Sequence, residues 1–424
     1  MKTIEQIAAE LQGYDPQALA AERVNAFLAR LVEPINDTED VGIFEALGRV
    51  LAEDVVSPIS VPPHDNSAMD GFAFDGAALG SSPLVLRCQG TAFAGKAWAH
   101  PVGAGECLKI MTGAIMPAGL DTVVPIEFVR VDGDTVTIPP GVVKPGDNRR
   151  FMGEDLMAGQ PALRRGQVLG PAALGLVASL GLPTVRVRRR ARVAYFSTGD
   201  EILSLGEAPR EGAVYDSNRY TVFGLLTRLG VEVIDMGVVP DQPARLEAAF
   251  REAAARADAV ITSGGVSMGE ADHTKAMMKQ LGDVAFWRIA MRPGRPMAVG
   301  RINEGAQSAV LFGLPGNPVA VMVTFLAFVR PALQRLMGAD VAPPVLLQAR
   351  SGEAMRKKPG RTEYQRGTVE RAADGTLVAR TTGNQGSGVL SSMVQANGLI
   401  VLRHDQGNVA VGDTVEVMVF DGVI

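Results

Sequence analysis

The feature that most constrains the fold is an alternation of strand-like and helix-like segments between residues 192 and 336. Four short apolar runs rich in β-branched residues are typical of buried strands: 193–196, 231–236, 259–262 and 309–312. Three stretches with helical spacing lie between these runs: 218–229, 243–255 and 273–281. This order predicts βαβ units on a mostly parallel sheet with helices on both faces, which is a central three-layer α/β domain.

The segment before this region predicts a helical part that is interrupted by a β domain. Residues 1–56 have helical spacing, and a helix beginning at Thr38 as its N-cap is expected over 38–51. Residues 58–156 consist of short apolar runs between Gly, Pro and Asp turns, which is typical of a small β domain. Because a further helix is expected over 170–181, the helical part is predicted to resume after this insertion.

Period-2 apolar runs with Gly-containing turns follow Pro343 and predict a second β domain, barrel-like in form. The chain is therefore predicted to be a multidomain α/β plus β protein. Its expected parts are a discontinuous helical, linking domain (1–57 and 157–187), a small β domain (58–156), an α/β domain (188–336) and a C-terminal β domain (337–424).

Composition excludes several classes of partner. A net charge of −5 gives no overall basic field, so no nucleic-acid partner is expected. No uninterrupted apolar run approaches the roughly 20 residues of a membrane helix, and the first residues lack the pattern of a signal peptide. The two cysteines, Cys88 and Cys107, have no metal-ligand or redox spacing. We therefore expect a cytoplasmic protein with no membrane partner.

A glycine-rich loop at 262–274 joins a predicted strand to a predicted helix. Gly264 and Gly265 let a ligand approach the backbone, while Ser263 and Ser267 add hydroxyl donors. Backbone N–H groups and the positive end of a helix dipole bind phosphate at such a position. The pattern is neither a P-loop nor a dinucleotide fingerprint, so a plain turn that needs glycine for its geometry stays an alternative.

Acidic residues follow three of the predicted strands. Glu201, Asp241 and Asp272 are expected at the carboxyl ends of parallel strands, where open α/β sheets bind ligands. Carboxylates that face a phosphate repel it unless a hard cation lies between them, and Mg²⁺ is the usual cation. These three acids are the candidate magnesium ligands. Each one alone also fits a solvated loop acid or a helix cap.

Further polar segments are ambiguous when taken singly. Asp216 fits a helix cap, while Arg219 from the same segment is a candidate to face the ligand. The stretch 287–296 carries Arg288, Arg292 and Arg295, which form either a set of fixed cations for an oxyanion or a solvated basic loop. Residues 313–318 fit an anion loop or a rigid turn. In the predicted small β domain, the polar insertions 62–72, 109–114 and 149–155 are most often turns when they occur alone.

Taken together and in order, these segments resemble the molybdopterin molybdenumtransferase family, the MoeA-type enzymes, which also include the E domain of gephyrin. The matching motifs cover nearly the whole chain: 65–72 (DNSAMDGF), 110–114 (IMTGA), 153–155 (GED), 197–201 (STGDE), 215–219 (YDSNR), 263–267 (SGGVS), 269–272 (GEAD) and 314–318 (LPGNP). Each motif is weak, but the ordered set is highly specific.

The resemblance implies an elongated homodimer in which the small β domain of one subunit faces the α/β domain of the other. It implies a reaction of adenylylated molybdopterin with molybdate, which gives molybdenum cofactor and AMP and requires Mg²⁺. The adenylyltransferase of the preceding step is an implied partner. Because the dithiolene sulfurs of the pterin hold the molybdenum, the chain needs no Cys or His cluster.

The resemblance also assigns residues to roles. The positions associated with activity are Asp70, Thr112, Asp155, Glu201, Asp241 and Asp272. The positions associated with substrate binding are Thr198, Asp216, Asn218, Arg219, Ser263, Gly264, Gly265, Ser267, Arg288, Arg292, Pro315 and Pro318. Arg288 and Arg292 stand where the family commonly carries lysine, which keeps the charge but changes the donor geometry.

Two alternatives remain open at this level. One is the adenylyltransferase of the preceding step, whose domain resembles residues 192–336 alone; the segments 58–156 and 343–424 argue against it. The other is a scaffold that binds the pterin without turnover, and the presence of all the acids named above argues against that role.

Overall fold

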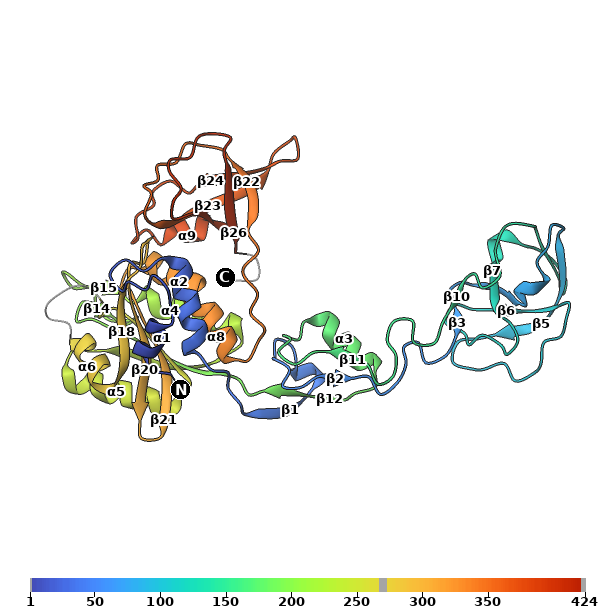
Figure 1. Cartoon of the computed structure of the whole chain (residues 1–424), viewed down its shortest axis with the longest axis horizontal. Helices are drawn as coiled ribbons and strands as arrows, with labels where there is room; N and C mark the ends of the chain where they lie inside the picture. Colours follow the sequence, from blue (N-terminus) through green and yellow to red (C-terminus); the bar gives the residue numbers. More distant parts are fainter. Residues whose placement is uncertain (1, 267–272, 421–424) are drawn as a thin grey trace.

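The computed structural model describes residues 2–266 and 273–420 as an elongated molecule. In Figure 1 the α/β part and a C-terminal barrel lie at one end, and a small β domain lies at the other. A thin linking region, through which the chain passes in both directions, separates the two ends. The fold is thus multidomain α/β plus β, as predicted.

A six-stranded mixed sheet forms the centre of the α/β part, in the order β16-β13-β17-β21-β20-β18. Four parallel strands are β13 (Arg192–Thr198), β16 (Glu232–Val239), β17 (Ala259–Ser263) and β21 (Gln307–Leu314). The sequence predicted all four. Two antiparallel strands, β18 (Gly282–Arg288) and β20 (Pro296–Glu304), extend the sheet beyond β21 and were not predicted.

Helices cover both faces of this sheet, which confirms the three-layer prediction. One face packs against α5 (Pro243–Arg256) and α6 (His273–Leu281), whose apolar side chains share a core with Ala194 and Phe196. The opposite face packs against α4 (Ser217–Leu229), α7 (Pro318–Thr324), the π-helical turn η4 (Phe325–Val329) and α8 (Arg330–Leu336). The N-terminal helices α1 (Ile4–Ala9) and α2 (Ala21–Leu31) join the same core.

The run Pro318–Leu336 is the one helical stretch among the described residues that is long and apolar enough to cross a membrane. Its most apolar window is 78% buried inside the protein. That burial is what a core helix of a folded domain requires, because its apolar side chains pack against the sheet.

Paired strands build the linking region. β1 (Thr38–Gly42) pairs with β12 (Thr184–Arg188), and β2 (Val55–Val56) pairs with β11 (Pro161–Leu163). Helix α3 (Pro171–Ser179) packs beside them, close to where a helix was expected.

The predicted helix over 38–51 is wrong. These residues form β1 followed by one 3₁₀ turn, η1 (Ile43–Glu45). Pairing with a strand far along the chain overrides the helical spacing, and it places the acidic Asp40 opposite the basic Arg186, whose side chains lie 3.6 Å apart.

The small β domain contains a second six-stranded sheet, in the order β7-β4-β6-β5-β9-β8. Its strands are β4 (Gly71–Phe74), β5 (Leu84–Ala92), β6 (Glu106–Ile110), β7 (Thr122–Pro125), β8 (Arg130–Asp132) and β9 (Thr135–Ile138). The short pieces around it are η2 (Gly76–Ala78), η3 (Ile126–Phe128), and β3 (Asn66–Ser67) paired with β10 (Arg149–Arg150). Its core is built around Phe72, Phe74 and Ile138.

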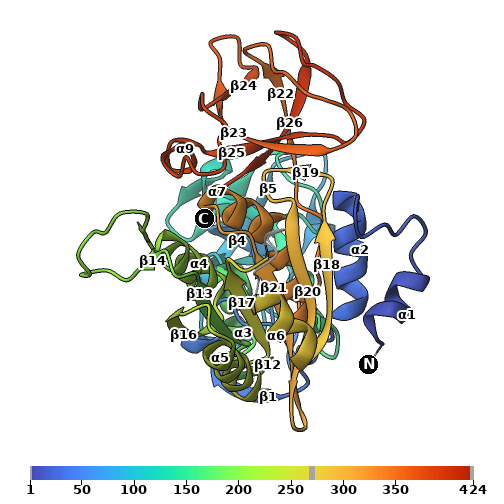
Figure 2. The ribbon, with the colours of Figure 1, turned by 90° about the vertical axis from the view of Figure 1, so that its left-hand side faces the viewer.

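Five strands at the C-terminal end close into a barrel: β22 (Leu347–Ser351), β23 (Thr362–Arg371), β24 (Leu377–Thr381), β25 (Gly398–Leu402) and β26 (Thr414–Val419). Closure occurs because β23 pairs with both β24 and β25. The barrel stacks on the α/β part (Figure 2), and β19 (Met291–Arg292) connects the two by pairing with β23. Helix α9 (Ser391–Gln395) packs against β23.

Candidate active site

A cavity of about 550 Å³ lies where the carboxyl ends of the parallel strands meet the barrel. The antiparallel register pairs Arg288 with Pro296, and Ala298 with Gly313, so the turn 288–296 reaches this same edge of the sheet. Four loops of the α/β part therefore line the cavity together with two loops of the barrel. The predicted ligand edge of the sheet is thus a hollow with walls from two domains.

The glycine-rich loop forms one wall of this cavity through Gly264 and Gly265. Gly264 has φ +89°, and a Cβ there would lie 2.4 Å from the carbonyl oxygen of Thr198. A Cβ on Gly265, at φ +66°, would lie 2.5 Å from Cβ of Thr274. The turn therefore needs both glycines for its geometry, and it also faces the cavity; phosphate binding by this loop stays a prediction.

Ser263 supports this wall from behind. Its side chain is only 3% exposed, and its hydroxyl lies 2.7 Å from the hydroxyl of Tyr195 and 3.2 Å from Oγ of Ser197. Burial raises the pKa of Tyr195, so the phenol stays protonated within this network. Two further candidates of the loop, Ser267 and Asp272, lie outside the described residues.

Three arginines give the cavity its positive charge. Arg292 and Arg295 are exposed, and neither has an ion-pair partner within the described ranges. Arg361, from the loop before β23, donates from Nε to Oε1 of Glu363 at 2.8 Å. Arg288 is exposed and does not line the cavity. Of the two arginines assigned by resemblance, Arg292 therefore lines the cavity and Arg288 does not. Arg295 and Arg361 line it as well.

The barrel adds Gln385 and Ser387 to the lining. Sequence reasoning missed these two residues and Arg361, because it treated the barrel as a separate domain and the stretch 383–384 only as a turn. The usable signal was the polar run of residues 382–387, which carries more side-chain donors than a turn requires.

Of the predicted magnesium ligands, Glu201 lines the cavity. Asp241 does not line it, although its Oδ1 accepts a long hydrogen bond of 3.4 Å from the hydroxyl of Thr274, next to the glycine-rich loop. Among residues 2–266 and 273–420, no three Asp, Glu, His or Cys side chains gather in a way that could hold a metal ion. The oxygen chemistry of Glu201 and Asp241 suits Mg²⁺, and the third predicted ligand lies outside the described ranges.

The N-terminus of α4 supports the site rather than lining it. Asp216 caps the helix by accepting from the backbone N–H of Arg219 at 3.1 Å. Asn218 donates to the carbonyl of Gly316 at 2.7 Å, which fixes the turn that carries Pro315 into the cavity. Arg219 pairs with Asp235 at 2.7 Å, and this carboxylate raises the pKa of Arg219.

Three buried oxygens near the cavity have no hydrogen-bond partner among residues 2–266 and 273–420: Oγ1 of Thr198, Oδ2 of Asp216 and Oδ1 of Asn218. A buried polar atom without a partner costs about 1–3 kcal/mol. Such groups are typical of sites that bind a ligand.

Pro318, at the first position of α7, does not line the cavity.

The remaining predicted residues lie in the small β domain. Asp70 accepts two hydrogen bonds from Thr112, so the structure joins these two residues as a pair. The exposed Asp155 is held through its backbone N–H, which donates to the carbonyl of Val61 at 3.1 Å. This domain lies at the far end of the molecule from the cavity (Figure 1). Within one chain, Asp70, Thr112 and Asp155 do not join the other candidates.

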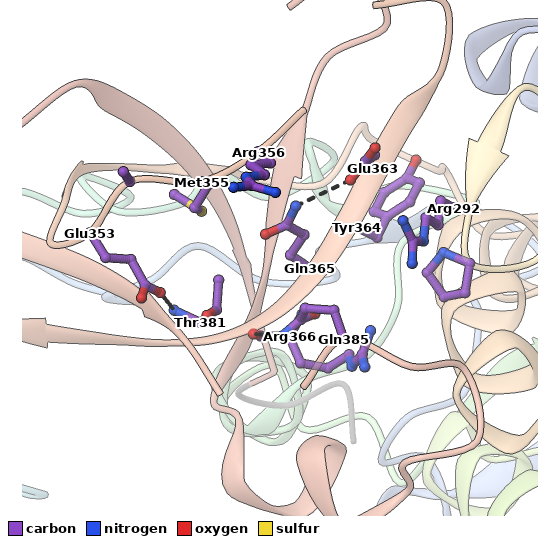
Figure 3. Close-up of a pocket in the computed structure, with 12 residues that line it drawn as sticks. Arg292, Glu353, Met355, Arg356, Glu363, Tyr364, Gln365, Arg366, Thr381 and Gln385 are labelled. Carbon is purple, nitrogen blue, oxygen red and sulfur yellow. Dashed lines mark hydrogen bonds between the residues drawn. The ribbon is translucent and has the colours of Figure 1, made fainter. Parts of the chain in front are cut away.

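A second cavity, of about 240 Å³, opens between the barrel and the loop of Arg292 (Figure 3). It shares Arg292, Pro293 and Gln385 with the larger cavity. Its lining also includes the buried Arg366, whose pKa is lowered to about 10 by burial and by the charge of Arg292. Arg366 therefore stays charged near neutral pH.

Comparison with known proteins agrees with the fold. Three family models match: the MoeA N-terminal region (domain I and II) at residues 18–181, a probable molybdopterin binding domain at 194–335, and the MoeA C-terminal region (domain IV) at 348–420. A molybdopterin molybdenumtransferase of Haemophilus influenzae is 41% identical over 91% of this chain and 95% of its own length. Gephyrin of Dictyostelium discoideum is 30% identical over 90% of this chain and 59% of its own length.

Among solved structures, a molybdopterin biosynthesis MoeA protein from Pyrococcus horikoshii OT3 superimposes with a TM-score of 0.81 at 28% identity. The match covers 95% of this chain and all of that one. The ordered motifs, the three family models and the full-length relatives agree, and this chain belongs to the MoeA family, whose curated bacterial relatives are named molybdopterin molybdenumtransferases.

Proposed function

We propose that this protein inserts molybdenum from molybdate into adenylylated molybdopterin, in a Mg²⁺-dependent reaction that releases AMP. The observation that carries the proposal is the convergence of Arg292, Arg295 and Arg361 on the cavity that the glycine-rich loop also lines. Such a cavity can bind two anionic substrates at once, through its fixed cations and through the backbone N–H groups that the glycines leave accessible. The molybdopterin molybdenumtransferases at 41% and 35% identity support the assignment to this reaction class.

Molybdate is proposed to bind among the three arginines. A tetrahedral dianion needs several fixed donors, and guanidinium groups supply paired N–H donors without losing their charge. The hydroxyl of Ser387 adds a neutral donor from the barrel, and Gln385, whose amide is hydrogen-bonded to the backbone of Arg366, lines the same wall. Arg295 and Arg361 take the place that the sequence gave to Arg288, because they line the cavity and Arg288 does not.

The phosphate part of the pterin substrate is proposed to lie along the opposite wall. There Gly264 and Gly265 leave the backbone open, and Glu201 faces the same space. Mg²⁺ held by Glu201, Asp241 and Asp272 would neutralise charge on the phosphoanhydride as it is cleaved. The arginines hold the oxyanion close to the pterin sulfurs, so that binding orients the two substrates.

The small β domain is proposed to complete the site of a second copy. Asp70, Thr112 and Asp155 are far from the cavity of their own chain, so a homodimer with crossed domains is the arrangement in which they reach one. Exposed apolar side chains on the linking region, Phe44, Leu47 and Val168, offer surface for such an interface. The compartment is proposed to be the cytoplasm, with the adenylyltransferase of the preceding step as a transient partner.

The test of the function is direct. Purified protein is incubated with adenylylated molybdopterin, molybdate and Mg²⁺, and AMP release is followed by chromatography. AMP should appear only when all three are present. No AMP release under conditions in which a known insertase turns over would disprove the proposal, and consumption of ATP with molybdopterin would point to the adenylyltransferase instead.

The crossed dimer has its own test. Asp70→Asn and Glu201→Gln variants are each expected to lose turnover. If the sites are shared between subunits, mixing the two under conditions that exchange subunits should restore one intact site in each mixed dimer. About a quarter of wild-type turnover would then return, since half of the dimers are mixed and each has one intact site of two. No recovery despite subunit exchange would show that each site is built within one chain.

A further inference from the structure

Arg366 is a buried cation without a carboxylate partner within the described ranges. Its side chain, on β23, is 1% exposed. All of its hydrogen-bond partners are neutral: Nε donates to Oγ of Ser392 at 2.9 Å, and Nη2 donates to the carbonyls of Gly386 at 2.9 Å and Asn384 at 3.2 Å. A charge buried against neutral groups is costly.

Those carbonyls belong to the loop 382–387, which reaches the larger cavity. The backbone N–H of Arg366 donates to Oε1 of Gln385 at 2.8 Å, and Nε2 of Gln385 donates back to the carbonyl of Arg366 at 3.0 Å. Arg366 therefore holds this loop through hydrogen bonds from both its side chain and its backbone. Figure 3 shows Arg366 and Gln385 side by side, with Arg292 on the facing segment.

The far end of the loop is tied to the α/β part. The backbone N–H of Val319, in the first turn of α7, donates to the carbonyl of Ser387 at 3.1 Å. The loop thus spans the two domains, with Arg366 as its anchor in the barrel. Of the two side chains that it brings to the cavity, Gln385 belongs to the residue bonded to the backbone of Arg366, and Ser387 to the residue whose carbonyl is bonded to Val319.

We propose that Arg366 is a positioning residue for the oxyanion: it holds the loop 382–387 so that Gln385 and Ser387 face the anion among the cavity arginines. The inference rests on the proposed function. It states that Arg366 determines the shape of one wall of the molybdate site. Arg366 itself does not need to touch the anion. Its planar guanidinium donates from two separate nitrogens, Nε and Nη2, and the compact ammonium of lysine cannot reproduce this spacing of donors.

The first measurement is molybdate binding by isothermal titration calorimetry, without the pterin. Arg366→Lys keeps the charge but loses the fork, and we expect molybdate to bind about tenfold more weakly, which corresponds to about 1.4 kcal/mol. In turnover assays the KM for molybdate should rise by a similar factor, while kcat and the KM for the pterin substrate change less than about twofold. Ser392→Ala removes one acceptor and should weaken binding by about threefold.

Lys357 provides the matched control. It is a buried cation of the same barrel, 4% exposed, which donates to the carbonyls of Lys358, His404 and Gln406 and lines neither cavity. Lys357→Met should lower the melting temperature as Arg366→Met does, yet leave molybdate affinity unchanged in the folded protein. This comparison shows whether molybdate binds more weakly because the loop 382–387 is displaced or because the barrel is less stable.

The outcomes separate the two claims. Folded Arg366→Lys and Ser392→Ala variants with wild-type molybdate affinity would overturn the positioning role and leave the proposed function intact. Equal rises of the KM for both substrates would also overturn it, because a local wall should affect one substrate only. A wild-type protein that binds no molybdate and releases no AMP would instead refute the proposed function itself.

Discussion

Thr112 donates two hydrogen bonds to the same carboxylate oxygen of Asp70, from its backbone N–H at 2.6 Å and from its hydroxyl at 2.7 Å. Both bonds favour the ionised carboxylate and hold the pKa of Asp70 below its ordinary value. Replacing Thr112 with Val removes the hydroxyl bond. The pKa of Asp70, measured by NMR titration, is expected to rise toward the ordinary value of an aspartate, and turnover is expected to fall because the carboxylate loses its fixed orientation.

The barrel contains a matched pair that serves as the control. Thr376 donates to Oδ1 of Asp374 from its backbone N–H at 3.0 Å and from its hydroxyl at 2.7 Å, and these bonds lower the pKa of Asp374. Thr376→Val should raise the pKa of Asp374 and leave turnover unchanged. If the variants of Thr112 and Thr376 affected turnover equally, the pair in the small β domain would have no special role.

Gly264→Ala is expected to destabilise the glycine-rich loop. The new Cβ would meet the carbonyl of Thr198 at 2.4 Å, and φ would stay at +89°. We expect a loss of about 2–3 kcal/mol in the free energy of unfolding, measured by urea denaturation. Gly181→Ala tests the effect of the positive φ alone, since Gly181 has φ +73° and open space around it. This variant should lower the free energy of unfolding by only about 1 kcal/mol. Equal losses would mean that the contact with Thr198 is unimportant.

The cationic cavity makes a prediction about individual arginines. Arg295→Ala and Arg361→Ala should each weaken molybdate binding by about tenfold or more, because each removes a charge that faces the anion. Arg288→Ala should have a smaller effect, since Arg288 does not line the cavity. Calorimetric titration measures all three. If Arg288→Ala weakened molybdate binding more than Arg295→Ala, the oxyanion would instead bind at Arg288, as the sequence suggested.

Asp65 ties together two segments of the small β domain and makes their stability depend on pH. Its carboxylate accepts from the backbone N–H of Met152 at 2.7 Å and from Nε of Arg149 at 2.8 Å, and these bonds lower its pKa. A lowered folded pKa gives stability above the unfolded pKa, which is lost as the pH falls through the folded value. Asp65→Asn should therefore lower the melting temperature at pH 7 and have less effect near pH 3.

The paired comparison is a set of melting curves of wild type and Asp65→Asn between pH 7 and pH 3. The gap between the two curves should narrow as the pH falls, because wild-type Asp65 becomes protonated and loses the same interactions. A gap that stays constant over this range would show that the ionised carboxylate is not the source of the stability.

Much of the central fold could be predicted because its signals are local. The four parallel strands and the helices α4 to α6 each carry their own periodicity, and β17 ends in glycines that the backbone geometry requires. The antiparallel strands β18 and β20 were missed because the Pro and Gly residues between them read as a loop. The helix expected at 38–51 was wrong because the pairing of β1 with β12 is decided by a segment far along the chain.

The sequence by itself determined the family, through the ordered set of motifs along the chain. It also determined the sheet edge at which the ligand is expected and the glycines that shape the loop after β17, since these two depend on residues close together in the chain. The tertiary structure alone decided which cations share the cavity with that loop. Arg361, Gln385 and Ser387 come from the barrel, and the pairing of β19 with β23 together with the bond from Val319 to Ser387 brings them to the cavity. The structure also separated Asp70 and Thr112 from the cavity, because a rigid two-stranded link holds the small β domain at the far end of the molecule. Contacts between residues distant in sequence depend on how whole domains pack, and local patterns carry no record of that packing.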